Sequence, residues 1–524
     1  MSRRPNFLLV MADQLAAPAL PMYGHAIVKA PNLQRLAADG VTFLNAYCNN
    51  PICASSRFSM MSGQLSSRIG AYDNAAEFCA STPTFAHYLR ALGYRTCLSG
   101  KMHFIGPDQL HGFEERLTTD IYPSDFAWTP DWLTPGDPYA PSSQSMRGVV
   151  EAGPCERSLQ LDYDDEAAFE AVRWLYDYAR TGNERPFLLT VSFTHPHNPY
   201  TITPQYWQRY DQDAIDLPQV PDIPFEQRDP WSQRQYRLIR QDEYALTSDA
   251  VRTARHAYYG MIGYVDDQVG RLLDTLESAR LRDNTVVIFV SDHGDMMGER
   301  GMWYKFNPFE WSLRVPFIVR APGVDGGQRR DKVVSLVDLL PTFLDLATDG
   351  NPPPVANEID GHSVAELLHG DGGGWPDTAA AEYTAEGTCA PCLILRAGNY
   401  KYVYCETDPA MLFDLRQDPH ELKNLCGNPE YCEIEERMRA EIFKRWSPEE
   451  LRTKVIASQQ RRLFVQKSLL SGRRHAWDFQ PSKDASRQYV RSGGDASPTG
   501  AKERARFPHV SPRPPDFPRI KNKA

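Results

Sequence analysis

The feature that most constrains this chain is a regular alternation of short apolar runs with longer amphipathic segments, which continues to about residue 292. The apolar runs have the length of buried strands and lie at 6–11, 94–98, 187–193 and 285–292. The amphipathic segments have helical spacing and lie at 31–40, 82–92, 164–180 and 256–279. Strands that alternate with helices predict an α/β fold, in which a large, mainly parallel sheet is flanked by helices on both faces.

The C-terminal third has a different organisation. Its composition shifts at 350–376, where NPPPVANE and GDGGGWP predict loops or a linker. Short strands are then predicted at 393–395, 400–404 and 411–414, before a charged helix at 429–446. From Gly472 the chain is basic and rich in Pro, Ser and Arg, which is typical of disorder, although HAWDFQP at 475–481 is an aromatic island. We therefore expect three parts: a catalytic α/β domain, a small antiparallel α+β subdomain and an extended tail, at 1–375, 376–460 and 461–524.

Composition excludes several classes of protein. Of the 524 residues, 42% are hydrophobic and 24% are charged, which are ordinary globular values. The net charge of −10 argues against nucleic acid or an acidic membrane as the main partner. The apolar run at 7–12 is too short for a signal segment, and the ten cysteines form no dense framework, which favours free thiols. We expect a cytoplasmic protein that binds neither membrane nor nucleic acid.

Three candidate site residues follow the ends of predicted strands. In parallel sheets ligands bind beyond the carboxyl ends of the strands, so Asp13, His195 and Asp292 are predicted to converge. Asp13 and the segment Ser291–Asp295 (SDHGD) offer carboxylate oxygens and one imidazole, a donor set that favours calcium, magnesium or manganese over zinc. Either segment alone could equally be a strand end that caps the next helix.

Basic residues and one cysteine complete the candidates. Cys53 lies four residues before Arg57 at the predicted start of a helix, where backbone N–H groups and a guanidinium can hold an anion. Lys101 and His103 lie in SGKMHFIG, and Lys305 lies in MWYKFNP. Taken alone, each is explained as well by a structural role as by a catalytic one. The CAPC segment at 389–392 has no second cysteine pair at zinc spacing, so we interpret it as structural.

Taken in order, these motifs resemble the sulfatase family of the alkaline-phosphatase-like superfamily over roughly residues 5–350. The stretches YDNAAE (72–77), SGKMHFIGPDQLHGFEERLTTDIYP (99–123), AEGT (385–388) and WDFQP (477–481) resemble the choline-sulfatases within it. That narrower resemblance extends over nearly the whole chain. It implies an alkaline-phosphatase-like fold and hydrolysis of a sulfate monoester, with choline sulfate as the expected substrate.

The resemblance also assigns roles to particular residues. It implies one divalent cation, with calcium favoured and magnesium or manganese as alternatives, held by Asp13, Cys53, Asp292 and His293. Gln14 occupies a place where many sulfatases have a second aspartate, so its ligation is left open. The residues that match the cradle around the sulfate are Arg57, Lys101, His103, His195 and Lys305. The residues that match the substrate pocket are Asn74, Trp128, Glu386 and, from the tail of a neighbouring subunit in a dimer or tetramer, Asp478.

A mechanism follows from these roles as an expectation. Cys53 matches the residue that a formylglycine-generating enzyme oxidises to formylglycine, whose hydrate attacks sulfur. Arg57, Lys101 and the metal would neutralise the sulfate oxygens. His195 or Lys305 would protonate the leaving alcohol, and His103 would act as the base that releases sulfate. Trp128 with Glu386 would bind a quaternary ammonium group.

One position departs from the sulfatase pattern. The signature normally has proline or alanine two residues after the cysteine, and here that residue is Ser55. Three interpretations remain: Cys53 is converted; it stays a thiolate and serves a phosphonate monoester or phosphodiester hydrolase; or the chain is a non-catalytic relative that binds an anion or osmolyte. The presence of every charged member of the site argues against the third.

Overall fold

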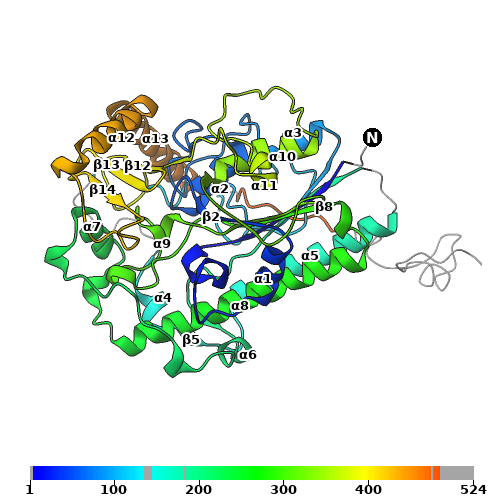
Figure 1. Ribbon diagram of the computed structural model, residues 1–524, viewed down its shortest axis with the longest axis horizontal. Helices are drawn as coiled ribbons and strands as arrows, with labels where there is room; N and C mark the ends of the chain where they lie inside the picture. The colour runs from blue at the N-terminus through cyan, green and yellow to red at the C-terminus, as the bar shows by residue number, and fades with distance from the viewer. Residues whose placement is uncertain (1–3, 135–143, 182–184, 474–475, 484–524) are drawn as a thin grey trace, which may run out of the picture.

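A computed structural model describes residues 4–134, 144–181, 185–473 and 476–483 (Figure 1). Within them the largest element is an eight-stranded sheet with the strand order β10-β2-β9-β8-β1-β6-β3-β4. Its strands are β1 (Asn6–Ala12), β2 (Val41–Tyr47), β3 (Arg95–Gly100), β4 (Glu115–Arg116), β6 (Phe187–Ser192), β8 (Thr285–Ser291), β9 (Phe317–Arg320) and β10 (Gln328–Ser335).

The central strand β1 explains why the sheet is parallel. It pairs in parallel with β6 and with β8, and Phe7 lies opposite Leu188 on one side and Val286 on the other. All seven of its residues are buried, because an apolar strand in a parallel sheet is covered on both faces. Strand β9 is antiparallel to its neighbours β2 and β8, so the sheet is mixed but mainly parallel, which confirms the predicted α/β class.

Helices cover both faces of this sheet (Figure 1). On one face lie α1 (Pro31–Ala38), α5 (Leu159–Thr181) and α8 (Ser248–Ser278). On the other lie α2 (Cys53–Ser62), α3 (Phe85–Ala91), α10 (Leu339–Ala347) and α11 (Ala365–His369). The connections contain the shorter helices α4 (Arg147–Val150), α6 (Pro204–Trp207), α7 (Pro230–Leu238) and α9 (Glu310–Leu313), and the two-stranded pair β5 (Gly153–Pro154) and β7 (Thr201–Ile202).

The C-terminal part forms a second, antiparallel sheet beside the first (Figure 1). Its strands β11 (Thr378–Tyr383), β12 (Cys392–Ala397), β13 (Tyr400–Cys405) and β14 (Met411–Asp414) pair in sequence order. Two helices follow, α12 (Cys432–Arg445) and α13 (Pro448–Leu469). The boundary expected at residue 460 falls inside α13.

The apolar pattern of the sequence does not predict helix α13, and the reason is physical. Its buried side includes Leu451 and Val455 but also Ser458, Gln459 and Arg462, so polar residues interrupt the apolar stripe. Beyond it, Trp477 of the aromatic island packs edge-on against Phe126, with ring centroids 5.3 Å apart. Residues 484–524 of the expected tail lie outside the described part of the chain. Among the helices of the described residues, none combines the length and the apolar character needed to cross a membrane.

Candidate active site

The site forms where four neighbouring strands end. Strands β8, β1, β6 and β3 are adjacent in the sheet, so the segments that follow their carboxyl ends lie side by side. Asp292 follows β8, Asp13 follows β1 and Lys101 follows β3. The backbone N–H of Asp13 donates to the carbonyl of His195, which joins the segments after β1 and β6. This is the convergence that the strand ends predict.

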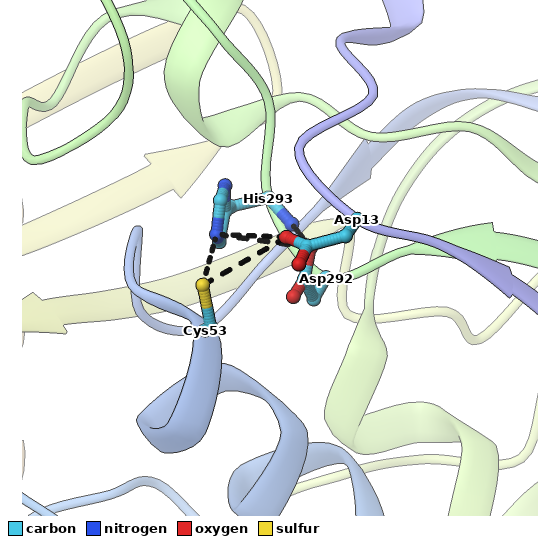
Figure 2. Close-up of side chains that lie close together, drawn as sticks. All are labelled: Asp13, Cys53, Asp292 and His293. Carbon is cyan, nitrogen blue, oxygen red and sulfur yellow. Dashed lines mark hydrogen bonds and ion pairs between the residues drawn. The ribbon is translucent and has the colours of Figure 1, made fainter. Parts of the chain in front are cut away.

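Four buried side chains offer a metal-binding donor group (Figure 2). Asp13, Cys53, Asp292 and His293 each present one ligand atom, and these atoms all lie within 4.8 Å of one another. The Sγ of Cys53 is 3.1 Å from Nε2 of His293 and 3.7 Å from Oδ1 of Asp13. The other ring nitrogen of His293 is 3.0 Å from the carbonyl oxygen of Gly294, which leaves Nε2 directed at the group. A metal-ligating histidine is oriented in this way, so the residues present fit a divalent cation.

Cationic side chains neutralise this buried group. Nε of Arg57 donates to Oδ2 of Asp292 at 2.7 Å, and Lys101 forms an ion pair with Asp13. Burial alone would raise the pKa of Asp13, but the charges of Lys101 and Arg57 hold it well below its usual value. Burial lowers the pKa of His293 to about 4, which keeps its imidazole neutral and able to bind a metal.

A cavity of about 390 Å³ opens over the thiol of Cys53. Nζ of Lys305 lies 2.7 Å from Oε1 of Gln14, 2.7 Å from Nε2 of His197 and 3.5 Å from the sulfur. The residues that line the cavity are Cys53, Asn74, His103, Ile121, Tyr122, Trp128, Gln144, Ser158, Leu159, Gln160, His197, Asn198, Pro199 and Lys305. Of the predicted cradle, His103 and Lys305 line the cavity, whereas Arg57 and Lys101 do not line it and instead pair with Asp292 and Asp13 of the donor group.

The structure corrects the prediction for His195. Its Nδ1 is 2.6 Å from Oδ2 of Asp164 on α5, and its ring packs against Tyr264 with centroids 4.8 Å apart. His195 is fully buried there and does not line the cavity. His197, two residues later in the same THPHNP motif, takes the position that we expected for His195. Burial and the neighbouring Lys305 hold the pKa of His197 well below its usual value.

Aromatic rings form one wall of the cavity. The ring of Tyr122 stacks on His103 with centroids 4.9 Å apart, and Trp128 meets Tyr122 at 5.5 Å. The ammonium of Lys101 lies 4.1 Å from the centroid of Tyr122. Trp128 is half-buried and lines the cavity, so it is more than a core aromatic. Tyr122 lies within the stretch 99–123 that resembles the choline-sulfatases, but no motif in the sequence marks it as a site residue.

His103 is held in an unusual backbone conformation. Its φ is +60°, in the left-handed region, and both its own N–H and that of Met102 donate to Oδ2 of Asp120. Burial lowers the pKa of the His103 imidazole, so the ring is neutral beside Cys53. A neutral imidazole can accept a proton, as the expected role of base requires.

The predicted substrate residues divide into two groups. Asn74 and Trp128 line the cavity, and Oδ1 of Asn74 accepts the backbone N–H of Ala54 at 2.9 Å. Glu386 is buried and does not line the cavity; burial, followed by the charge of Asp73, raises its pKa to about 7. Asp478 accepts hydrogen bonds from Ser124 of its own chain and does not line the cavity of that chain. Its role in a neighbouring subunit stays a prediction.

Both polar atoms of the Gln14 side-chain amide form hydrogen bonds with residues outside the donor group. Its Nε2 donates to Asp295 and Asn198, and its Oε1 accepts from Lys305. Gln14 is therefore placed to orient Lys305, and its ligation of the ion stays a prediction.

Comparison with known proteins agrees with this geometry. The Sulfatase family model matches residues 5–349, the model for the C-terminal part of N-sulphoglucosamine sulphohydrolase matches 298–447, and the choline sulfatase enzyme C-terminal model matches 453–507. The choline-sulfatase of Rhizobium meliloti is 44% identical over 93% of this chain and 96% of its own length. An arylsulfatase of Clostridium perfringens is 28% identical over 84% and 94%.

A solved structure shares the fold. The phosphonate monoester hydrolase of Agrobacterium radiobacter superposes with a TM-score of 0.69 and 26% identity, over 86% of this chain and 96% of that one. Family model, relatives and fold lead to one conclusion: the chain belongs to the sulfatase family and is a sulfuric ester hydrolase.

Proposed function

We propose that this enzyme hydrolyses choline sulfate to choline and sulfate, and that it does so with a formylglycine derived from Cys53 and one divalent cation. The observation that carries the proposal is the division of the cavity into two ends. Cys53, Lys305 and His197 form an end suited to an anion, and Tyr122 and Trp128 form an aromatic wall. Choline sulfate has the same division, with an anionic sulfate at one end and a quaternary ammonium at the other.

The sulfate end is built for charge stabilisation. Asp13, residue 53, Asp292 and His293 would hold the cation, which when bound supplies a Lewis acid for the sulfate oxygens. Lys305 places its ammonium beside residue 53 and so beside the sulfate that this residue attacks. Arg57 and Lys101 form ion pairs with Asp292 and Asp13 in a buried site and add positive charge behind the sulfate.

Proton transfers are assigned to groups that touch the cavity. Formylglycine supplies, as its hydrate, the hydroxyl nucleophile that a thiol does not provide. Lys305 donates to Nε2 of His197, so this pair holds a proton at the wall of the cavity and can pass it to the leaving alcohol. His103, neutral and beside residue 53, would accept the proton when sulfate is released.

The choline end needs no hydrogen-bond donor. Its aromatic wall offers the ring of Trp128, which would contribute about 0.5–2 kcal/mol to binding of a desolvated cation. Glu386, buried within electrostatic range of Lys305 and Asp73, would supply a carboxylate charge beyond that wall. The 44% identical relative named choline-sulfatase supports this choice of substrate.

The similarity to a phosphonate monoester hydrolase favours a second candidate function, phosphonate monoester hydrolysis. In this alternative, Cys53 would act unmodified. Two measurements separate the candidates. Mass spectrometry of the Cys53 peptide should show a loss of about 18 Da relative to the thiol, because oxidation to the aldehyde replaces the thiol group with a carbonyl oxygen. A panel of choline sulfate, an aryl sulfate and a phosphonate monoester should give the highest kcat/KM for choline sulfate. An unmodified thiol with preference for the phosphonate would overturn the proposal.

Glu386 predicts a pH dependence of substrate binding. Its pKa is raised to about 7, so the carboxylate that attracts a cation is present above that pH and is lost below it. The KM for choline sulfate should therefore rise as the pH falls through about 7. Glu386→Gln should raise KM roughly tenfold at pH 8, because the electrostatic attraction of the carboxylate for the cation is lost, and it should flatten this dependence. A KM profile that is unchanged in the variant would remove Glu386 from the site.

A further inference from the structure

The buried side of helix α13 carries an arginine whose partner, Asp73, directly precedes the cavity-lining residue Asn74. The guanidinium of Arg462 donates from Nη1 to Oδ1 and from Nη2 to Oδ2 of Asp73, both at 2.7 Å. Asp73 has no exposed side-chain surface, and the Arg462 side chain is 7% exposed. A bidentate, desolvated pair of this kind fixes the orientation of both partners.

Further hydrogen bonds tie the same helix to two other segments. Nη1 of Arg462 also donates to Oγ1 of Thr129 at 3.1 Å. The side chain of Gln459 accepts the backbone N–H of Trp132 at 3.0 Å, and the indole of Trp132 donates to the carbonyl of Ala385 at 3.0 Å. These three segments, at Asp73, Thr129–Trp132 and Ala385, each lie beside one proposed substrate residue: Asn74, Trp128 and Glu386 respectively.

Asp73 is also linked, through its neighbour Asn74, to the segment that carries the nucleophile position, residue 53. Asn74 follows Asp73 in the chain, and its Oδ1 accepts the N–H of Ala54, the residue after Cys53 in the first turn of α2. Asp73 also accepts the N–H of Ala75 at 2.9 Å, which fixes the turn that presents Asn74. A shift of Asp73 would therefore move Asn74 relative to Cys53.

We propose that Arg462 is a positioning residue for specificity, which fixes the spacing of the three segments around the choline end and neutralises Asp73 next to Glu386. This inference rests on the proposed function. Arg462 does not line the cavity; it acts through Asp73 and Thr129. The C-terminal helix thereby contributes to substrate selection by a site whose chemistry lies in the N-terminal domain.

The charges around Glu386 predict that this role of Arg462 changes the pH at which Glu386 ionises. Asp73, Lys305 and Tyr383 are the titratable groups that interact with it, and the charge of Asp73 opposes its ionisation. With Arg462 removed, the positive charge that offsets Asp73 is lost, so Glu386 should ionise at higher pH. With both Asp73 and Arg462 made neutral, that opposition disappears and Glu386 should ionise at lower pH than in the wild type.

The test compares Arg462→Met with the double variant Asp73→Asn/Arg462→Met and with Arg461→Met, the exposed neighbouring arginine, as matched control. In Arg462→Met we expect the KM for choline sulfate to rise about tenfold or more, while kcat for an aryl sulfate falls less than about threefold. The pH at which KM falls should move up in Arg462→Met and down in the double variant. Arg461→Met should match the wild type.

Two results would overturn the inference. One is an unchanged KM for choline sulfate in Arg462→Met; the other is an equal loss on both substrates without a shift of the pH profile. If Arg462→Met does not fold, the double variant provides the test, because it leaves no unpaired buried charge. A wild-type KM and a wild-type pH profile in the double variant would reject the inference. A wild-type enzyme without choline sulfate turnover overturns the proposed function itself, before any variant is compared.

Discussion

Replacement of Cys53 with alanine should lower kcat for sulfate ester hydrolysis by at least about four orders of magnitude, the loss expected when a covalent nucleophile is removed. The thiol position is at the floor of the cavity and within the donor group, so both the nucleophile and one metal ligand disappear. Steady-state rates with choline sulfate and an aryl sulfate measure the effect. The loss should be of similar size on both substrates, because the attack on sulfur is common to them.

The matched control is Cys48→Ala. Cys48 is also a buried free cysteine, but it packs in the hydrophobic core and is not among the cavity-lining residues. We expect Cys48→Ala to retain activity wherever it remains folded, with the melting temperature of each variant measured alongside. Undiminished turnover by folded Cys53→Ala protein would exclude covalent catalysis at this residue.

The sequence predicted the parts of the molecule that local pattern determines. Buried parallel strands are apolar along their whole length, which is why β1 and β8 could be placed from 6–11 and 285–292. Their ends in turn located Asp13 and Asp292, since a parallel sheet gathers the residues that follow its strands. The strand pattern thus located two members of the donor group, and the resemblance to the sulfatase family supplied Cys53 and His293.

The choice between His195 and His197 could not be made in this way. Both follow β6 in one motif, and what separates them is Asp164, which accepts the Nδ1 and backbone N–H of His195 from helix α5. That partner lies 31 residues earlier in the chain. The same argument applies to α13, because Arg462 meets a carboxylate 389 residues away. A buried polar residue is recognised only when its distant partner is known.

Lys305→Met gives the second large effect and tests the proton donor. Lys305 differs from the other cations of the site: its hydrogen-bond partners Gln14 and His197 are neutral, whereas Arg57 and Lys101 are paired with Asp292 and Asp13. Its removal leaves no carboxylate without its ion-pair partner, so the fold should persist and the kinetic effect can be interpreted. We expect kcat for choline sulfate to fall by about two to four orders of magnitude, the range for loss of general acid catalysis.

The loss should depend on the leaving group. Choline is a poor leaving alcohol that needs a proton as the bond to sulfur breaks, whereas a nitrophenolate leaves without one. The kcat of Lys305→Met should therefore fall at least about tenfold less on a nitrophenyl sulfate than on choline sulfate. Lys423→Met, at an exposed lysine, is the control and should match the wild type on both. An equal loss on the two esters would limit Lys305 to the binding of sulfate. It would also argue against His197 as the proton donor, because burial and Lys305 both keep that imidazole neutral.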